Sequence, residues 1–139
     1  MLLKSDILKR LHEIYSHIPS TISCQHCHFC CGPILWFYPE ELNIRDYLLN
    51  HNMEYIIWTT DEFLHHDMRC PYLKDDRCSI YPVRPFVCRI QGSFPDLPCR
   101  FPQKNQLSYE TIDILKQEFE QLLKETHSIG IFYGTRKRD

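Results

Sequence analysis

The sequence is organised around one short stretch, residues 24 to 31, which reads Cys24-Gln25-His26-Cys27-His28-Phe29-Cys30-Cys31. Four thiols fall within eight residues, so little loop-closure entropy is lost when they converge on one site. Thiolates are ligands that zinc and iron–sulfur clusters prefer. The other four cysteines all follow this loop, and we expect the intervening chain to bring them back to it. They are Cys70, Cys78, Cys88 and Cys99.

The bulk composition is that of a folded globular protein. Hydrophobic residues make up 43% of the 139 residues and aromatic residues 13%, which predicts a packed core instead of disorder. This length is most simply one domain, so we expect a single cysteine-cluster metal-binding domain over residues 1 to 139. The net charge of −2 predicts no nucleic-acid partner. No run approaches the roughly 20 apolar residues that span a bilayer, so we expect no membrane partner.

The even number of cysteines would also suit disulfides, and the cellular compartment decides between the two interpretations. The first residues, Met1-Leu2-Leu3-Lys4-Ser5-Asp6, lack the uninterrupted apolar run and the cleavage site of a secretory signal. We therefore expect a cytoplasmic location. In a reducing cytoplasm, clustered cysteines hold metal more often than they form disulfides.

Hydrophobic periodicity predicts helices near both ends of the chain. The first covers residues 5 to 18 and could be capped by Ser5 or Asp6. The second begins at a Ser108 cap and ends near residues 127 to 130.

The middle of the chain predicts one further helix and a possible strand. Pro39 followed by Glu40 and Glu41 is typical of a helix start, and this helix should end near Asn50. Residues 53 to 60 are rich in β-branched and aromatic side chains, which favours a strand.

A β-hairpin is predicted around the polar tip Lys74-Asp75-Asp76, between residues 63 to 73 and residues 77 to 81. Its facing arms would bring Cys70 and Cys78 within reach of one site. Five prolines punctuate residues 82 to 102, so only irregular structure or one short helical turn is expected there. The predicted class is α+β: a small, irregular, metal-stabilised single domain with terminal helices and a short hairpin.

The spacing of the cysteines favours an iron–sulfur cluster. Cys24, Cys27 and Cys30 form two CxxC steps in series. This spacing matches the first three ligands of bacterial ferredoxin loops, in which a cysteine followed by proline completes the set. Cys70-Pro71 could take that closing part here, although it is distant in sequence.

Zinc is the alternative metal, and Cys31 bears on the choice. A tetrahedral zinc site could be built from four thiolates, namely Cys24, Cys27, Cys70 and Cys78. Adjacent side chains of an extended segment point in opposite directions, so Cys30 and Cys31 rarely bind one ion together. Cys31 is therefore a ligand of a second centre or of a larger cluster, or else a small buried hydrophobe.

Two arginines, Arg84 and Arg89, lie close to Cys88 in the sequence. They could contact the cofactor by hydrogen-bonding sulfurs or by offsetting the negative charge of a cluster. The structural alternative is an ion pair with a nearby acid. The acids considered are Asp75, Asp76 and Glu62.

Residues 24 to 89 resemble the YkgJ-type cysteine-cluster family, known for its CxxCxxCC motif and described as zinc- or iron-chelating proteins. The match includes the Cys-Pro-x-Leu step at Cys70 and the Cys-x-Ile-Tyr-x-x-Arg-Pro-x-x-Cys-Arg step at Cys78. The resemblance implies a small bacterial metal-chelating protein. The ligands that it implies are Cys24, Cys27, Cys30, Cys31, Cys70, Cys78 and Cys88. Cys99 lies outside the part that can be matched.

Two classes of function are open. The first is a metal-binding or redox module that holds a [4Fe-4S] cluster, or Zn²⁺ as the alternative, and acts with a protein partner. The second is a metal-dependent enzyme, since some larger relatives in the family resemble flagellin lysine N-methylases. The chain has only four glycines and no glycine-rich strand-to-helix loop for S-adenosylmethionine. We favour the first class because no cofactor fold or acid–base pair is recognisable.

Overall fold

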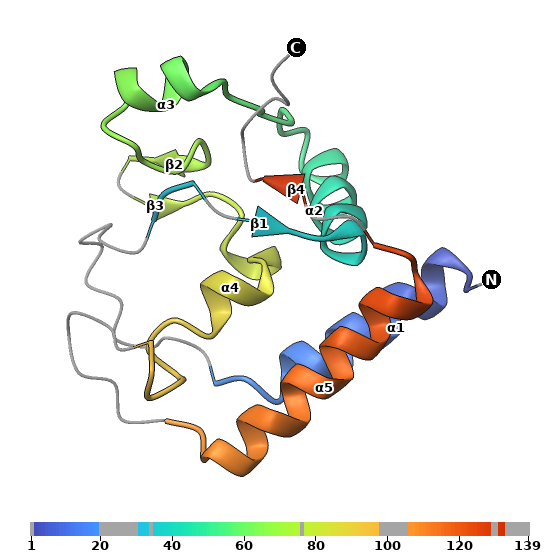
Figure 1. Ribbon diagram of the computed structural model, residues 1–139. Helices are drawn as coiled ribbons and strands as arrows, with labels where there is room; N and C mark the ends of the chain where they lie inside the picture. Colours follow the sequence, from blue (N-terminus) through green and yellow to red (C-terminus); the bar gives the residue numbers. More distant parts are fainter. Residues whose placement is uncertain are drawn as a thin grey trace.

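The computed structural model of the chain describes residues 2–19, 31–33, 35–75, 77–97, 106–128 and 131–132 (Figure 1). In these ranges the chain forms five α-helices, one 3-10 turn and two antiparallel sheets of two strands each. The predicted α+β class is confirmed. Within the same ranges, no helix combines the length and the apolar character needed to cross a membrane.

The two terminal helices lie side by side (Figure 1), and both were predicted from periodicity. They are α1 (Lys4–Ser16) and α5 (Tyr109–Glu125). Ser108 caps α5 as predicted, because its Oγ accepts a hydrogen bond from the Thr111 N–H at 3.2 Å. The predicted cap of α1 is wrong: the N-cap is Leu3, with no side-chain cap. Ser5 and Asp6 instead belong to the first turn of the helix.

Helix α2 (Tyr38–Asn50) begins and ends where Pro39 and Asn50 predict. It follows β1 (Leu35–Trp36), which pairs antiparallel with β4 (Ile131–Phe132) near the other end of the chain. The strand that leaves the cysteine loop is therefore held by a segment far away in the sequence.

The strand predicted over residues 53–60 is wrong. This segment has no regular structure apart from a single bridge at Trp58, and α3 (Thr60–His65) begins at its end. A capping box explains the helix: Thr59 Oγ1 accepts from the Glu62 N–H at 3.2 Å, and Glu62 Oε1 accepts from the Thr59 N–H at 3.0 Å. Local hydrogen bonding at this start outweighs the β propensity of the preceding side chains.

The predicted hairpin is confirmed, but its first arm is much shorter than residues 63 to 73: residues 63–65 belong to α3, and the arm begins at Leu73, after Cys70. Strands β2 (Leu73–Lys74) and β3 (Arg77–Cys78) pair antiparallel, with Leu73 opposite Cys78. The proline-rich segment that follows forms two short helical elements, η1 (Tyr81–Val83) and the four-residue helix α4 (Phe86–Arg89), where at most one short turn was expected.

Among the residues that the structure describes, buried hydrophobic side chains form two clusters. The helical core joins α1 and α5 to α4, and its residues are Ile7, Leu11, Ile14, Tyr15, Ile18, Phe86, Ile90, Phe94, Ile112, Leu115, Phe119 and Leu122. The hairpin core joins β1 and α2 to the hairpin and η1, and its residues are Trp36, Ile44, Leu48, Tyr72, Ile80 and Val83. Cys70 and Cys78 pack against the hairpin core, while Cys88 lies on α4, whose Phe86 belongs to the helical core.

Candidate metal centre

Three cysteines from separate segments come together beside the hairpin. Cys70 precedes β2, Cys78 ends β3 and Cys88 lies on α4, and all three are half-buried. Burial raises the pKa of the Cys88 thiol well above its ordinary value, and the nearby thiols of Cys70 and Cys78 raise this pKa further. The predicted return of Cys70 and Cys78 to one place is thus seen, and Cys88 joins them.

The end of the cysteine loop lies against the segment that leads into Cys70. A Cβ atom placed on Gly32 would lie 3.1 Å from the backbone oxygen of Met68. Met68 closes α3, because its N–H donates to the Phe63 carbonyl at 2.8 Å, and its φ of 59° is left-handed. The half-buried Cys31 is next to this contact. The close approach therefore sets where the loop joins the hairpin segment.

Replacing Gly32 by alanine should weaken this junction. The added Cβ meets a backbone carbonyl on a residue that already has positive φ, so the neighbour yields only at a cost, of about 1–3 kcal/mol for overpacking. We expect a lower thermal midpoint and lower metal content in Gly32→Ala, measured by thermal unfolding and metal analysis. Met68→Ala is the control, since it trims an exposed side chain and leaves the carbonyl in place. A Gly32→Ala protein that matches wild type in both measurements would contradict this account.

The two arginines near Cys88 have different surroundings. Arg84 is only 9% exposed; its Nε donates to the Tyr81 carbonyl at 3.0 Å and its guanidinium lies over the Tyr81 ring at 3.8 Å. Its charge lowers the pKa of Cys88, opposing the effect of burial. Within the described ranges, neither Arg84 nor Arg89 forms an ion pair with Asp75 or Glu62. Asp76, the third acid considered, lies outside those ranges.

Arg89 forms hydrogen bonds to backbone carbonyls of the segment before α4. Its Nε donates to the Arg84 carbonyl at 2.7 Å, and one of its terminal nitrogens donates to the Pro82 carbonyl at 2.8 Å. Its guanidinium lies over the Tyr15 ring at 3.9 Å. Burial lowers the pKa of Arg89, and the neighbouring Tyr15 and Glu40 side chains oppose this shift.

Two adjacent carboxylates of α2, those of Glu40 and Glu41, are buried, and the sequence does not predict this burial. Glu40 Oε2 accepts hydrogen bonds from the Tyr15 hydroxyl at 2.5 Å and from the Phe86 N–H. Burial raises the pKa of Glu40 to about 7, while these two hydrogen bonds act in the opposite direction. The sequence shows only two acids in the first turn of a helix, and nothing in their spacing predicts that Glu40 accepts a hydrogen bond from α4.

Glu41 is also a hydrogen-bond acceptor, for side chains in and beside the hairpin core. Its carboxylate accepts from Trp36 Nε1 at 2.9 Å, from Arg45 Nε at 2.7 Å and from the Tyr55 hydroxyl at 2.8 Å. Burial and the hydrogen bond to Glu41 raise the pKa of Tyr55 above its ordinary range. Glu41 therefore joins β1 to the irregular segment before α3.

The described part of the centre suits a thiolate-bound metal but is not by itself a complete site. Among the described residues, no group of three or more His, Cys, Asp or Glu side chains is arranged to hold a metal ion. The other predicted ligands, Cys24, Cys27 and Cys30, lie outside those residues, as does Cys99. The described donors are the thiols of Cys70, Cys78 and Cys88 beside a buried guanidinium, and thiolates are the type of ligand that zinc and iron–sulfur clusters take.

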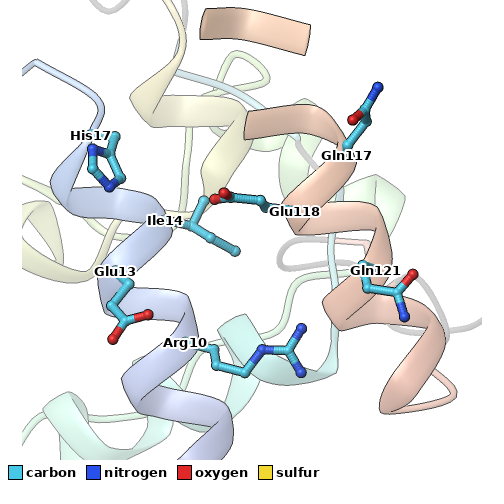
Figure 2. A pocket seen from close by; sticks show the side chains of 7 residues that line it. All are labelled: Arg10, Glu13, Ile14, His17, Gln117, Glu118 and Gln121. Atoms are coloured by element: carbon cyan, nitrogen blue, oxygen red, sulfur yellow. The ribbon is translucent and has the colours of Figure 1, made fainter. Parts of the chain in front are cut away.

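A separate groove of about 470 Å³ opens between α1 and α5 (Figure 2). It is lined by Ile14 and by six polar side chains, those of Arg10, Glu13, His17, Gln117, Glu118 and Gln121. None of the cysteines that the structure describes lines it, so the groove is separate from the thiols of Cys70, Cys78 and Cys88.

Comparison with known proteins places these features in a family. The family model "CxxCxxCC: Putative zinc- or iron-chelating domain" matches residues 23–123, a range that contains all eight cysteines, Cys99 included. No curated protein and no solved structure matches the chain. The match confirms the resemblance drawn from the cysteine motifs, and it covers well over half of the chain. The protein therefore belongs to the CxxCxxCC family, whose model describes a zinc- or iron-chelating domain.

Proposed function

We propose that the protein is a metal-binding module that holds an iron–sulfur cluster through the thiolates of its CxxCxxCC loop and of the cysteines that return to it. The observation that carries the proposal is the convergence of Cys70, Cys78 and Cys88 from the hairpin and α4. The proposed core ligands are Cys24, Cys27, Cys30 and Cys70. Cys78 and Cys88 come next, followed by Cys31.

The environment of Arg84 supports a negatively charged centre. A buried guanidinium costs several kcal/mol unless an opposite charge compensates it. In the described ranges Arg84 meets a backbone carbonyl and an aromatic ring, and it forms no ion pair with a carboxylate. Its charge favours the thiolate form of Cys88, which is the form that binds metal. Metal-bound thiolates would in turn supply the compensating negative charge.

The loop favours a [4Fe-4S] cluster over Zn²⁺. Three cysteines at successive two-residue gaps match a cluster-binding loop, whereas a zinc site usually takes two ligands from each of two elements. The cysteines also exceed the four ligands that one tetrahedral zinc binds. The cluster would supply electron-transfer chemistry, and the protein's residues would hold it and set its electrostatic surroundings.

A redox module of this kind works with a protein partner, and exposed apolar side chains beside the centre support that role. Val87, next to Cys88, is 38% exposed, and Met68, in the segment before Cys70, is 43% exposed. Exposed hydrophobic side chains are common on protein surfaces, but here two of them flank the cysteines. We propose that a protein partner contacts this edge.

The colour and composition of anaerobically purified protein test the cluster. We expect brown protein with broad visible charge-transfer absorption and with acid-labile sulfide, because both are properties of iron–sulfur centres. Colourless protein with stoichiometric zinc and no sulfide, from cells supplied with iron, would exclude the cluster and leave the zinc alternative.

Serine replacement tests the ligands one position at a time. We expect Cys24→Ser and Cys27→Ser to lose most of the bound metal, because serine does not replace a thiolate as a soft ligand. Cys99→Ser is the matched control, since Cys99 is the one cysteine outside the proposed set. If Cys24→Ser and Cys27→Ser keep full metal content and solubility, the loop is not the site.

A further inference from the structure

A buried carboxylate on α2 contacts both α1 and α4, the helix that carries Cys88. Glu40, on α2, is 1% exposed, and its Oε2 accepts from the Tyr15 hydroxyl of α1 and from the Phe86 N–H of α4. The Phe86 ring stacks on Phe119 of α5 with ring centroids 4.4 Å apart. Glu40 thus links the first residue of α4 to α1 and α2.

Helix α4 is too short to hold its own position. It spans four residues. The Cys88 and Arg89 N–H groups donate to the Pro85 carbonyl at 3.0 and 3.1 Å, whereas the Phe86 N–H at the helix start has no partner within the helix. Glu40 accepts from this Phe86 N–H, and the Arg89 side chain contacts the Arg84 and Pro82 carbonyls and the Tyr15 ring. Cys88 lies between Phe86 and Arg89 in α4. Phe86 donates to Glu40 and Arg89 lies over the Tyr15 ring, and the Tyr15 hydroxyl donates to Glu40.

We propose that Glu40 is a positioning residue for the metal centre: by fixing the start of α4 it directs the Cys88 thiol toward Cys70 and Cys78. This inference rests on the proposed function, because it takes Cys88 as a ligand. Groups that hold metal ligands in place typically change metal affinity by about 10- to 100-fold when they are replaced. The Glu40 carboxylate acts through the backbone of α4 and does not itself bind the metal.

The neighbouring carboxylate offers a matched control. Glu41 is also buried on α2 and also accepts several hydrogen bonds, but its partners are Trp36, Arg45 and Tyr55, and none of them lies on α4. Glu40→Gln and Glu41→Gln make the same chemical change at adjacent positions. Both should lower stability, and only Glu40→Gln should disturb Cys88.

The experiment measures how fast each cysteine is alkylated in protein loaded with Zn²⁺, which thiolates bind without redox chemistry. Labelled peptides identify Cys70, Cys78 and Cys88 by mass spectrometry, and urea unfolding of each variant gives its stability. We expect Zn²⁺ to protect Cys88 in wild type and in Glu41→Gln. In Glu40→Gln we expect Cys88 to be labelled about 10- to 100-fold faster than in Glu41→Gln, with smaller changes at Cys70 and Cys78.

Each outcome decides something. If Zn²⁺ does not protect Cys88 in wild type, the proposed role of Cys88 as a ligand fails. If Cys88 is protected in wild type but reacts equally fast in both glutamine variants, Cys88 remains a ligand and the positioning role is overturned. Should Glu40→Gln not fold, Tyr15→Phe removes only the hydroxyl that orients the carboxylate. It is expected to give the same Cys88-specific increase at smaller size, and its absence overturns the proposal.

Discussion

Removal of the metal is expected to unfold the hairpin core while the helical core keeps its helices. Cys70 and Cys78 pack against the hairpin core, so losing the metal leaves thiols there with no bound ion to hold them together. The binding free energy of a structural metal is folding free energy, about 10–16 kcal/mol for zinc in zinc-finger peptides. Among the described residues, the interface of α1 and α5 contains no cysteine, so we expect it to gain nothing directly from the metal.

Tryptophan fluorescence and circular dichroism separate the two cores. The chain has two tryptophans: Trp36 lies in the hairpin core, and Trp58 stacks on His66 beside α3. Chelation should shift their emission to longer wavelength and lower the thermal midpoint, and much of the helical signal of α1 and α5 should survive. An apo protein with unchanged emission and an unchanged midpoint would show that the hairpin core is stable without metal.

Replacing Glu41 by alanine should be among the most destabilising single changes outside the cysteines. The substitution leaves the Trp36 indole N–H, the Tyr55 hydroxyl and the Arg45 guanidinium without the carboxylate they share. Leaving a buried donor without its hydrogen bond costs about 1–3 kcal/mol, and the Trp36 indole N–H is such a donor. Arg45 is largely exposed, so its ion pair with Glu41 adds little to the loss. Urea unfolding of the metal-loaded protein measures the loss.

An exposed carboxylate on the same helix provides the control for Glu41→Ala. Asp46 pairs with Lys4 at 2.6 Å, but both side chains are well exposed. Surface ion pairs of this kind contribute about 0–1 kcal/mol. Asp46→Ala should therefore unfold at nearly the same urea concentration as wild type. Equal effects of the two substitutions would mean that the Glu41 network does not hold the hairpin core together.

Elements with a strong local signal could be predicted from the sequence. The apolar stripe that follows Ser108 predicts α5, and Pro39 followed by two acids predicts α2. The polar tip around Asp75 predicts the hairpin, and in the structure Asp75 has the positive φ of a tight turn, 50°. Each of these depends on residues close together in the chain. The predicted strand before α3 is wrong, and the local signal that this part of the sequence does carry is the capping box of Thr59 and Glu62, which begins a helix.

The surroundings of the site could not be predicted, because they depend on contacts between distant segments. The spacing of the cysteines indicated the loop, and the hairpin tip indicated that Cys70 and Cys78 would approach each other. Nothing near Glu40 in the sequence indicates that Tyr15 and Phe86 will donate to it. The approach of Cys88 and the burial of Arg84 follow from that tertiary arrangement.

The pairing of β1 with β4 also bears on the order of events during synthesis. Pairs so far apart in the sequence form slowly, and on a ribosome the second strand emerges last. The loop at residues 24 to 31 and the cysteines up to Cys88 are translated well before Ile131 and Phe132. All the proposed ligands therefore leave the ribosome while β1 still lacks its partner strand. Metal delivered at that stage would reach the cysteines before β1 and β4 have paired.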